Sequence, residues 1–320
     1  MKLATYQSAD GSAKIAAVDT QRGQLLDLDA AHSIAHGKPS PHYRDMLALI
    51  DAGAEGLKGA HALAGEWPAK AAVPLAGTKL FAPLPEPRQF RDCMAFELHL
   101  LNANKQAEIR TGQKRKIADV WYKQPIYYKA NRYSTNSHDA DVIWPSYSKH
   151  MDYELELAAV LGRGGRDITP ETALSHIFGY TIFNDFSARD AQLAEMAAQL
   201  GPAKGKDFDG ANAFGPWIVT SDEIGDPHAL AMEARVNGER WGGGNSSTMH
   251  HKWPAILAHI SASETLRAGE IIGSGTVGTG CGLELGRKLE HGDVVELEIE
   301  KIGILRNRVL CRTLRVGRKY

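Results

Sequence analysis

The sequence contains few cysteines, no surplus of either charge and no long hydrophobic run. Its three cysteines, Cys93, Cys281 and Cys311, form no C-x-x-C pair, which argues against a disulfide framework or a zinc knuckle. The 37 basic and 38 acidic residues nearly balance, so nothing points to nucleic acid or an anionic membrane as a partner. No apolar run approaches the ~18 residues of a membrane span, and the first residues lack the apolar core of a signal peptide. We therefore expect a cytoplasmic protein.

The 320 residues also contain no internal repeat or heptad pattern, and they exceed the usual size of one domain. We expect a small α+β domain over residues 1–75 and a larger domain over residues 76–320. Pro83, Pro85 and Pro87 form a stiff connector near this boundary, because each proline fixes its own backbone φ. In the larger domain, many short strand patterns are joined by glycine turns. This pattern favours an α+β, β-rich roll or barrel over alternating βαβ units.

Acidic and apolar residues alternate in the stretch from Asp152 to Ala158. Alternation is the period of a strand with one buried face, so Asp152, Glu154 and Glu156 point the same way. Three carboxylates on one face need a cation or open water to balance their charge. The plainest alternative to a metal site is therefore a solvated acidic strand.

A second apolar run, 177–183, is followed by Asp185, and residues 187–190 then have the pattern of a capping box that begins a helix. Asp185 is therefore expected at a strand-to-helix corner. If this strand lies beside the acidic strand, Glu154, Glu156 and Asp185 form a cage of carboxylate oxygens. Such oxygens are the ligands that Mg²⁺, Mn²⁺ and Ca²⁺ prefer.

Other candidate residues cannot be assigned a role from their spacing alone. Residues 92–105 have the spacing of a helix that contains His99, but a lone histidine is more often packed or solvated than catalytic. Lys206 lies in a glycine loop, where lysines are usually solvated. The glycine-rich run 273–280 lacks the lysine and the following helix of a phosphate-binding loop, so we expect a tight bend close to a ligand. Glu284, just after this run, faces either that ligand or water.

Two motifs occur together in the order found in a known family. Residues 154–156 read Glu-Leu-Glu, and residues 184–190 read Asn-Asp-Phe-Ser-Ala-Arg-Asp. With these motifs the chain resembles the fumarylacetoacetate hydrolase family, and in particular its bacterial acylpyruvate-hydrolase-like members. The likeness covers roughly residues 80 to 315 and continues through 201–202, 204–208, 215–217 and 273–285.

The resemblance implies a mixed β-roll catalytic domain, a homodimer and a divalent metal, with Mg²⁺ expected and Mn²⁺ or Ca²⁺ as alternatives. Glu154, Glu156 and Asp185 match the family's metal ligands. His99 and Glu284 match its acid–base pair, so a merely packed or solvated histidine becomes the minority interpretation. The positions that match residues lining the family's active site or contacting its substrate are Lys206, Arg189, Gln192, Thr276 and Tyr128.

One position departs from the family pattern. Eukaryotic fumarylacetoacetases complete the metal site with an aspartate near the histidine, and Ala95 is expected at that position here. Three protein carboxylates leave more positions for water and substrate oxygens, which suits octahedral Mg²⁺ or Mn²⁺ better than Ca²⁺. The departure also weakens the case for fumarylacetoacetate itself, and bacterial members act on varied acylpyruvates and related 2-oxo acids.

We therefore expect a hydrolase that cleaves a C–C bond of an acylpyruvate or another β-diketone acid, similar to fumarylacetoacetate or fumarylpyruvate. His99, oriented by Glu284, would take a proton from water, while Lys206 and Gln192 would stabilise the oxyanion. The metal would hold the 2-oxo acid portion and stabilise the enolate that leaves. The same site also suits a 2-oxo acid decarboxylase, a tautomerase or a hydratase. A non-catalytic metal-binding scaffold is the distant alternative, and the pair of His99 and Glu284 argues against it.

Overall fold

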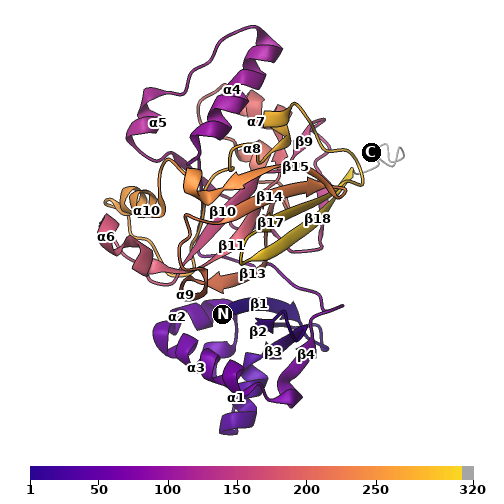
Figure 1. Cartoon of the computed structure of the whole chain (residues 1–320), viewed down its shortest axis with the longest axis vertical. Helices are drawn as coiled ribbons and strands as arrows, with labels where there is room; N and C mark the ends of the chain where they lie inside the picture. The colour runs from indigo at the N-terminus through magenta and orange to yellow at the C-terminus, as the bar shows by residue number, and fades with distance from the viewer. Residues whose placement is uncertain (312–320) are drawn as a thin grey trace, which may run out of the picture.

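An 11-stranded sheet joins the N-terminal residues to the centre of the molecule (Figure 1). The computed structural model describes residues 1–311. The strands of this sheet are β1 (Lys2–Gln7), β2 (Ala13–Asp19), β3 (Gln24–Asp27), β4 (Ala72–Pro74), β5 (Phe90–Cys93), β6 (Tyr127–Ala130), β7 (Thr135–Asn136), β10 (Leu155–Leu161), β11 (Ile177–Asp185), β13 (Asn212–Thr220) and β16 (Ile271–Gly273). Their order is β4-β3-β2-β1-β13-β11-β10-β16-β5-β6, with β7 beside β13.

A second sheet of five strands has the order β15-β14-β17-β18-β8. Its strands are β8 (Asp141–Trp144), β14 (Ala231–Val236), β15 (Glu239–Asn245), β17 (Val294–Ile299) and β18 (Gly303–Cys311). A short pair, β9 (Met151–Asp152) and β12 (Ser187–Ala188), lies apart from both sheets. The expected α+β, β-rich architecture is confirmed.

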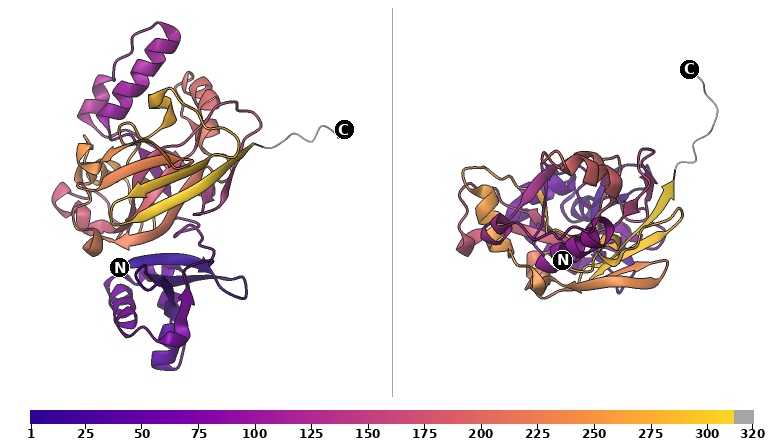
Figure 2. Two further views of the ribbon diagram at one scale, coloured as in Figure 1. Left: turned by 45° about the vertical axis from the view of Figure 1, so that its right-hand side comes forward. Right: turned by 90° about the horizontal axis from the view of Figure 1, so that it is seen from above.

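The N-terminal residues form their own end of the molecule, with three helices beside β1 to β4 (Figure 2). These helices are α1 (Leu28–His36), α2 (Met46–Asp51) and α3 (Gly53–Glu66). Strand β1 pairs antiparallel with β13, with Leu3 opposite Ile218. Leu3, Ile15, Phe214 and Ile218 belong to one buried hydrophobic cluster. The sheet and the hydrophobic core are thus continuous across residues 75 and 76. The expected domain boundary at that position stays a prediction.

The helix that carries His99 projects from the opposite end of the molecule (Figure 2). It begins at Glu97 rather than at residue 92 and continues to Thr111, because Phe90–Cys93 pairs as a strand with β16 and β6. The α-helices that follow residue 75 are α4 (Glu97–Thr111), α5 (Asp119–Lys123), α6 (Pro170–Ala173), α7 (Arg189–Met196), α8 (Ala203–Lys206), α9 (Ser221–Ile224), α10 (Trp253–Ser261) and α11 (Gly282–Leu285).

The corner after β11 differs from the expected capping box. Ser187 and Ala188 pair with β9 as a short strand, and α7 begins at Arg189 without a side-chain cap. The hydroxyl of Ser187 instead donates to the carbonyl of Asp185 at 2.9 Å. The sequence placed Asp185 correctly at a corner, but the residues after it extend the strand pairing before the helix begins.

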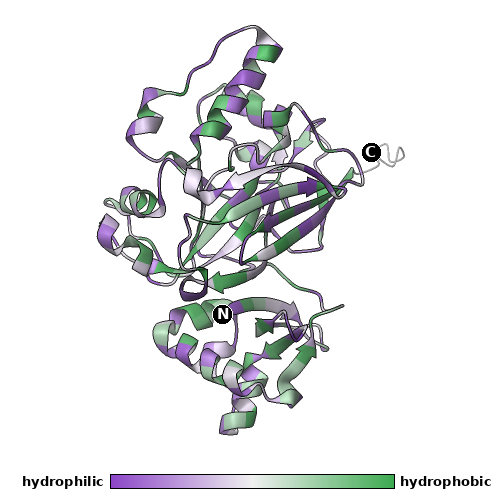
Figure 3. Ribbon diagram, viewed as in Figure 1, coloured by the Kyte–Doolittle hydropathy of each residue, from purple (hydrophilic) through white to green (hydrophobic). Residues whose placement is uncertain are grey.

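The acidic strand lies inside the core rather than on a solvated face. Strands β10, β11 and β13 are buried along their whole lengths, and Figure 3 shows hydrophobic residues along the central strands. Asp152 and Glu156 are fully buried, and Glu154 is 5% exposed. A solvated acidic strand is therefore excluded. Within residues 1–311, no helix combines the length and apolarity needed to cross a bilayer.

Candidate active site

Carboxylates from three strands converge beside β10. One carboxylate oxygen each from Asp92, Glu156 and Asp185 lies within 4.8 Å of the other two. Sheet register explains the meeting, because β10 lies between β11 and β16, and β16 pairs in parallel with β5 so that Gly273 is opposite Asp92. Glu154 lies next to this trio, since the N–H of Asp185 donates to its carbonyl at 3.3 Å.

The trio fits a divalent cation. Among the described residues, Asp92 Oδ1, Glu156 Oε1 and Asp185 Oδ1 are buried and have no hydrogen-bond partner. Buried acceptors without partners are costly, and a hard cation with oxygen ligands would satisfy all three atoms. Gly273 leaves the space for them, because a Cβ there would lie 2.5 Å from Asp92 Oδ1 and 3.0 Å from Glu156 Oε2.

Burial and mutual repulsion shift the protonation of these groups. Burial raises the pKa of Asp92 to about 6. Burial and the neighbouring Asp92 raise the pKa of Glu156 well above its usual value, and burial does the same for the pKa of Asp185. Glu154 behaves differently, because burial opposes its ionisation but Arg189 and Lys206 outweigh it and lower its pKa. In the described part of the chain, Asp92 and Glu156 therefore lack the direct ion pair with a basic side chain that Glu154 has.

Lys206 supplies a positive charge within the cluster. It lies in α8 with 2% of its surface exposed, and its Nζ is 2.6 Å from Glu154 Oε2. The same ammonium donates to Asp185 Oδ2. Burial disfavours the charged form, but Asp185 and Glu154 outweigh it and raise the pKa of Lys206. Lys206 is therefore a permanently charged hydrogen-bond donor rather than a base.

Arg189 ties the acidic strand to the start of α11. Its Nη2 lies 2.6 Å from Asp152 Oδ2 and 2.8 Å from Glu154 Oε1. Asp152 also accepts hydrogen bonds from the backbone N–H groups of Gly282 at 2.8 Å and Leu283 at 2.9 Å. Arg189 Nη1 donates to Gln192 Oε1 at 3.1 Å. The protein thus holds this guanidinium on several sides, and substrate contact by Arg189 or Gln192 stays a prediction.

His99 and Glu284 form a pair beside the cluster. His99 Nδ1 is 2.9 Å from Glu284 Oε1. The other oxygen, Oε2, accepts from Asn102 Nδ2 at 2.9 Å and from the backbone N–H of Thr279 at 2.7 Å. With Nδ1 as the donor, the neutral imidazole has a free lone pair on Nε2. An isolated β-bridge between Glu154 and Cys281 connects this region with the carboxylates.

Two further expected residues border the carboxylates. The hydroxyl of Tyr128 donates to Asp185 Oδ2 at 3.3 Å, and burial raises its pKa, so that it stays protonated. Thr276 is buried in the glycine-rich run after β16. In this run the N–H of Gly275 donates to Glu156 Oε2 at 2.8 Å, and its φ of 80° favours glycine. The structure thus places Tyr128 and the glycine-rich run that contains Thr276 beside the carboxylates, and the catalytic and binding roles of the predicted residues stay predictions.

Asp92 is the residue that the sequence analysis missed. Ala95 was expected where a further aspartate would stand, which led to a site with three carboxylates. The structure places Asp92, from β5, beside Glu156 and Asp185, and the set of carboxylates that binds a metal stays a prediction. The available signal was an aspartate inside a short, otherwise strand-like run, Phe90–Cys93, just before His99. Its meaning depends on the parallel pairing with β16, which no local pattern reveals.

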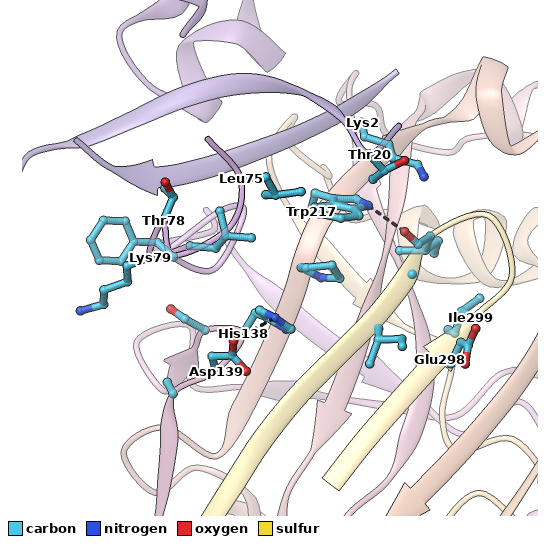
Figure 4. Close-up of a pocket in the computed structure, with 18 of the residues that line it drawn as sticks. Lys2, Thr20, Leu75, Thr78, Lys79, His138, Asp139, Trp217, Glu298 and Ile299 are labelled. Atoms are coloured by element: carbon cyan, nitrogen blue, oxygen red, sulfur yellow. Dashed lines mark hydrogen bonds and ion pairs between the residues drawn. The ribbon is translucent and has the colours of Figure 1, made fainter. Parts of the chain in front are cut away.

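A separate cleft of about 1250 Å³ lies between the N-terminal strands and the second sheet. Figure 4 shows Leu75, Thr78, His138 and Trp217 among the residues that line it. Trp217 Nε1 donates to the carbonyl of Ile302 across its edge at 2.7 Å. The lining comes from segments other than those of the carboxylates, so we place the candidate chemistry at the cluster.

Comparisons with known proteins agree on one family. Residues 94–310 match the model described as fumarylacetoacetate (FAA) hydrolase C-terminal. The chain is 33% identical over 238 residues to oxaloacetate tautomerase YisK of Bacillus subtilis, covering 73% of this chain and 74% of that protein. It is 37% identical over 191 residues to a 2,4-didehydro-3-deoxy-L-rhamnonate hydrolase of a Sphingomonas species, covering 58% of this chain and 65% of that protein. The structure of a fumarylacetoacetate hydrolase from Exiguobacterium antarcticum aligns with a TM-score of 0.75 and 29% identity, over 98% of this chain and 100% of that one.

Proposed function

The chain is an enzyme of the fumarylacetoacetate hydrolase family, and we propose that it hydrolyses a C–C bond of an acylpyruvate or related β-diketone acid with the help of a divalent metal. The observation that carries this proposal is the 2.9 Å contact between His99 and Glu284 beside the buried carboxylates. A purely structural cation would need no such pair. Family membership also supports a homodimer, and we propose that it works in the cytoplasm.

The residues proposed to hold the metal are Glu154, Glu156, Asp185 and Asp92. When bound, a divalent cation would supply Lewis acidity to the oxygens of a 2-oxo acid. Mg²⁺ remains our proposal, with Mn²⁺ and Ca²⁺ as competitors, because all the donors are carboxylate oxygens. Equilibrium dialysis of the chelator-treated protein against each metal tests which of the three cations it prefers. Sedimentation analysis separately tests whether the protein is a homodimer.

The chain's own groups account for the proton transfers. His99 Nε2 would accept a proton from water as the water oxygen forms its bond to the carbonyl carbon, while Glu284 stabilises the imidazolium. The ammonium of Lys206 and the amide of Gln192 would donate to the oxyanion. When the C–C bond breaks, its electron pair stays with the 2-oxo acid fragment, and the imidazolium returns a proton to that fragment. The products are a carboxylic acid and a 2-oxo acid.

The similarity to YisK favours keto–enol tautomerisation of oxaloacetate as a second candidate. In that reaction, His99 would move a proton between the carbon next to the carbonyl and the enol oxygen through solvent. No water would attack, and no C–C bond would break. The same metal and the same pair would be used, so only product analysis separates the two reactions.

A substrate panel with two readouts decides between them. The metal-loaded enzyme is given several acylpyruvates and oxaloacetate, and pyruvate release is measured separately from loss of enol absorbance. Hydrolysis releases a carboxylic acid and pyruvate from an acylpyruvate, whereas tautomerisation changes the enol signal of oxaloacetate without cleavage. His99→Ala should lower kcat by about 10²–10⁴-fold, while His61→Ala, at an exposed position, should not. Full activity in His99→Ala would remove the proposed base.

A further inference from the structure

Cys281 stands beside the proposed base without a role in the reaction. Its Sγ lies 3.5 Å from Glu284 Oε1 and 4.0 Å from His99 Nδ1. The thiol is fully buried, and burial raises its pKa, so that it stays protonated in the metal-free protein. One nitrogen, one sulfur and one oxygen that can bind a metal therefore lie close together, all within 4.8 Å of one another.

The spacing of these atoms is close to that of a tetrahedral zinc site. Bonds of about 2.3 Å to sulfur and about 2.0–2.2 Å to nitrogen and oxygen separate sulfur from either light atom by about 3.5 Å, and nitrogen from oxygen by about 3.3 Å. The structure has 3.5 and 4.0 Å for the sulfur contacts and 2.9 Å between His99 Nδ1 and Glu284 Oε1. Shifts of about half an ångström would complete the geometry.

We propose that His99, Cys281 and Glu284 form a second metal site, which takes a thiophilic divalent cation such as Zn²⁺ and thereby blocks the base. The binding itself is independent of the proposed reaction, while the block rests on the proposed function of His99. The oxygen-only cluster suits hard cations, whereas a thiolate and an imidazole favour Zn²⁺ over Mg²⁺. The two sites would therefore hold different metals.

The block follows from the tautomer of the imidazole. Zinc on Nδ1 requires a lone pair on that atom, so the ring proton must reside on Nε2. Nε2 then has no free lone pair and cannot accept a proton from water or from substrate. The thiol of Cys281 releases one proton to solvent as the sulfur binds, so one proton leaves for each cation taken up.

Neighbouring groups fix the carboxylate of Glu284, and the partly exposed side of His99 leaves a path for a cation. Glu284 Oε2 is fixed by Asn102 and by the N–H of Thr279, so Oε1 is the oxygen available to a cation. The side chain of His99 is 11% exposed, whereas that of Glu284 is fully buried. A cation would therefore enter past the imidazole. Helix α4 contributes both His99 and Asn102, one helical turn apart.

Spectroscopy with Co²⁺ as a stand-in for Zn²⁺ tests the site without any activity assay. With the oxygen cluster saturated by Mg²⁺, Co²⁺ should produce a sulfur-to-cobalt charge-transfer band in the near ultraviolet. The band should disappear in Cys281→Ser and in Cys281→Ala, and it should persist in Cys311→Ser, whose thiol lies elsewhere and is partly exposed. Absence of the band in the wild type, or its persistence in both Cys281 variants, would overturn the proposal.

Calorimetry and kinetics complete the test. In excess Mg²⁺, Zn²⁺ should bind one equivalent per wild-type chain, and Cys281→Ser should weaken that binding by about 100-fold or more. Zn²⁺ should then inhibit the wild type but spare Cys281→Ser and Cys281→Ala, with the inhibition of each protein measured relative to its own rate without zinc. Equal binding in wild type and both variants would refute the second site. If the enzyme has neither proposed activity, the binding results still decide this question separately.

Discussion

The ammonium of Lys206 lies 2.6 Å from Glu154 Oε2, in a buried cluster that already holds Asp92, Glu156 and Asp185. One fixed positive charge thus serves the carboxylate at the edge of the trio and also one of its members. A divalent cation would add the remaining compensation.

Replacing Lys206 with methionine should leave the negative charge of the carboxylate cluster without its paired ammonium. We expect the metal-free protein to lose about 3–5 kcal/mol of unfolding free energy, because Glu154 and Asp185 are left buried without their partner. Turnover should fall by about 10²–10³-fold. Urea unfolding and steady-state kinetics measure the two effects. Lys204→Met, on the same short helix but exposed, is the control and should change neither.

Glutamine at the two glutamates should have unequal effects on metal binding. Glu156 contributes an oxygen to the tight trio, whereas both oxygens of Glu154 already contact Lys206 or Arg189. We expect Glu156→Gln to weaken Mg²⁺ or Mn²⁺ binding more than Glu154→Gln does, in dialysis of the metal-free protein. The exposed Glu55→Gln provides the reference. Unchanged affinity in both cluster variants would show that the metal binds elsewhere.

Adding one methyl group at Gly273 should disturb the site directly. The new Cβ of Gly273→Ala would lie 2.5 Å from Asp92 Oδ1, so that carboxylate must move. Metal affinity should drop about tenfold or more, as judged by calorimetry. Gly65→Ala, in α3 with nothing within 4 Å of its added Cβ, should leave binding intact and stabilise the protein by about 0.5 kcal/mol. Equal metal affinities in the two alanine variants would show that the metal site does not need the space left by Gly273.

The raised pKa of Asp92 predicts a pH-dependent cost in the metal-free protein. Its pKa is about 6 when folded and about 4 when unfolded, so the folded state binds the proton more tightly. The stabilising contribution is therefore present below pH 4 and is lost as pH rises towards 6. The loss amounts to about 3 kcal/mol. Asp92→Asn should thus exceed the wild type in stability at pH 7 without metal, and this advantage should shrink near pH 4.5.

Denaturant unfolding at the two pH values measures that difference, and the same series with saturating Mg²⁺ is the control. Bound metal favours the ionised carboxylate, so it should stabilise the wild type more than Asp92→Asn at pH 7. A constant difference in unfolding free energy between the two proteins across this pH range, with or without metal, would show that folding does not raise the pKa of Asp92.

Much of the site was accessible from the sequence because its main motifs are local. The alternation around Glu154 and Glu156 predicted a strand with a shared acidic face, and the corner at Asp185 followed from the end of an apolar run. Burial was not predictable in the same way. An acidic face next to water and an acidic face around a cation have the same pattern, and only the flanking strands β11 and β16 distinguish them.

The residues that were missed or placed imprecisely depend on long-range pairing. The spacing from residue 92 predicts a helix, but parallel pairing with β16 holds Asp92 in the sheet. Serine is a residue type that often caps helices, but Ser187 pairs with β9 as part of a short strand instead. The position of Cys281 beside His99 is equally invisible locally, because the two residues come from distant parts of the chain.

The pairing of Leu3 with Ile218 also has a consequence for the protein's synthesis. The ribosome releases β1 before its neighbour β13 exists, and at about 5–20 residues per second the gap lasts on the order of ten seconds or more. During that interval, one edge of β1 presents unpaired backbone groups and an apolar surface to the cell. This edge therefore needs protection, by the nascent chain itself or by a chaperone, until β13 (Asn212–Thr220) has left the ribosome.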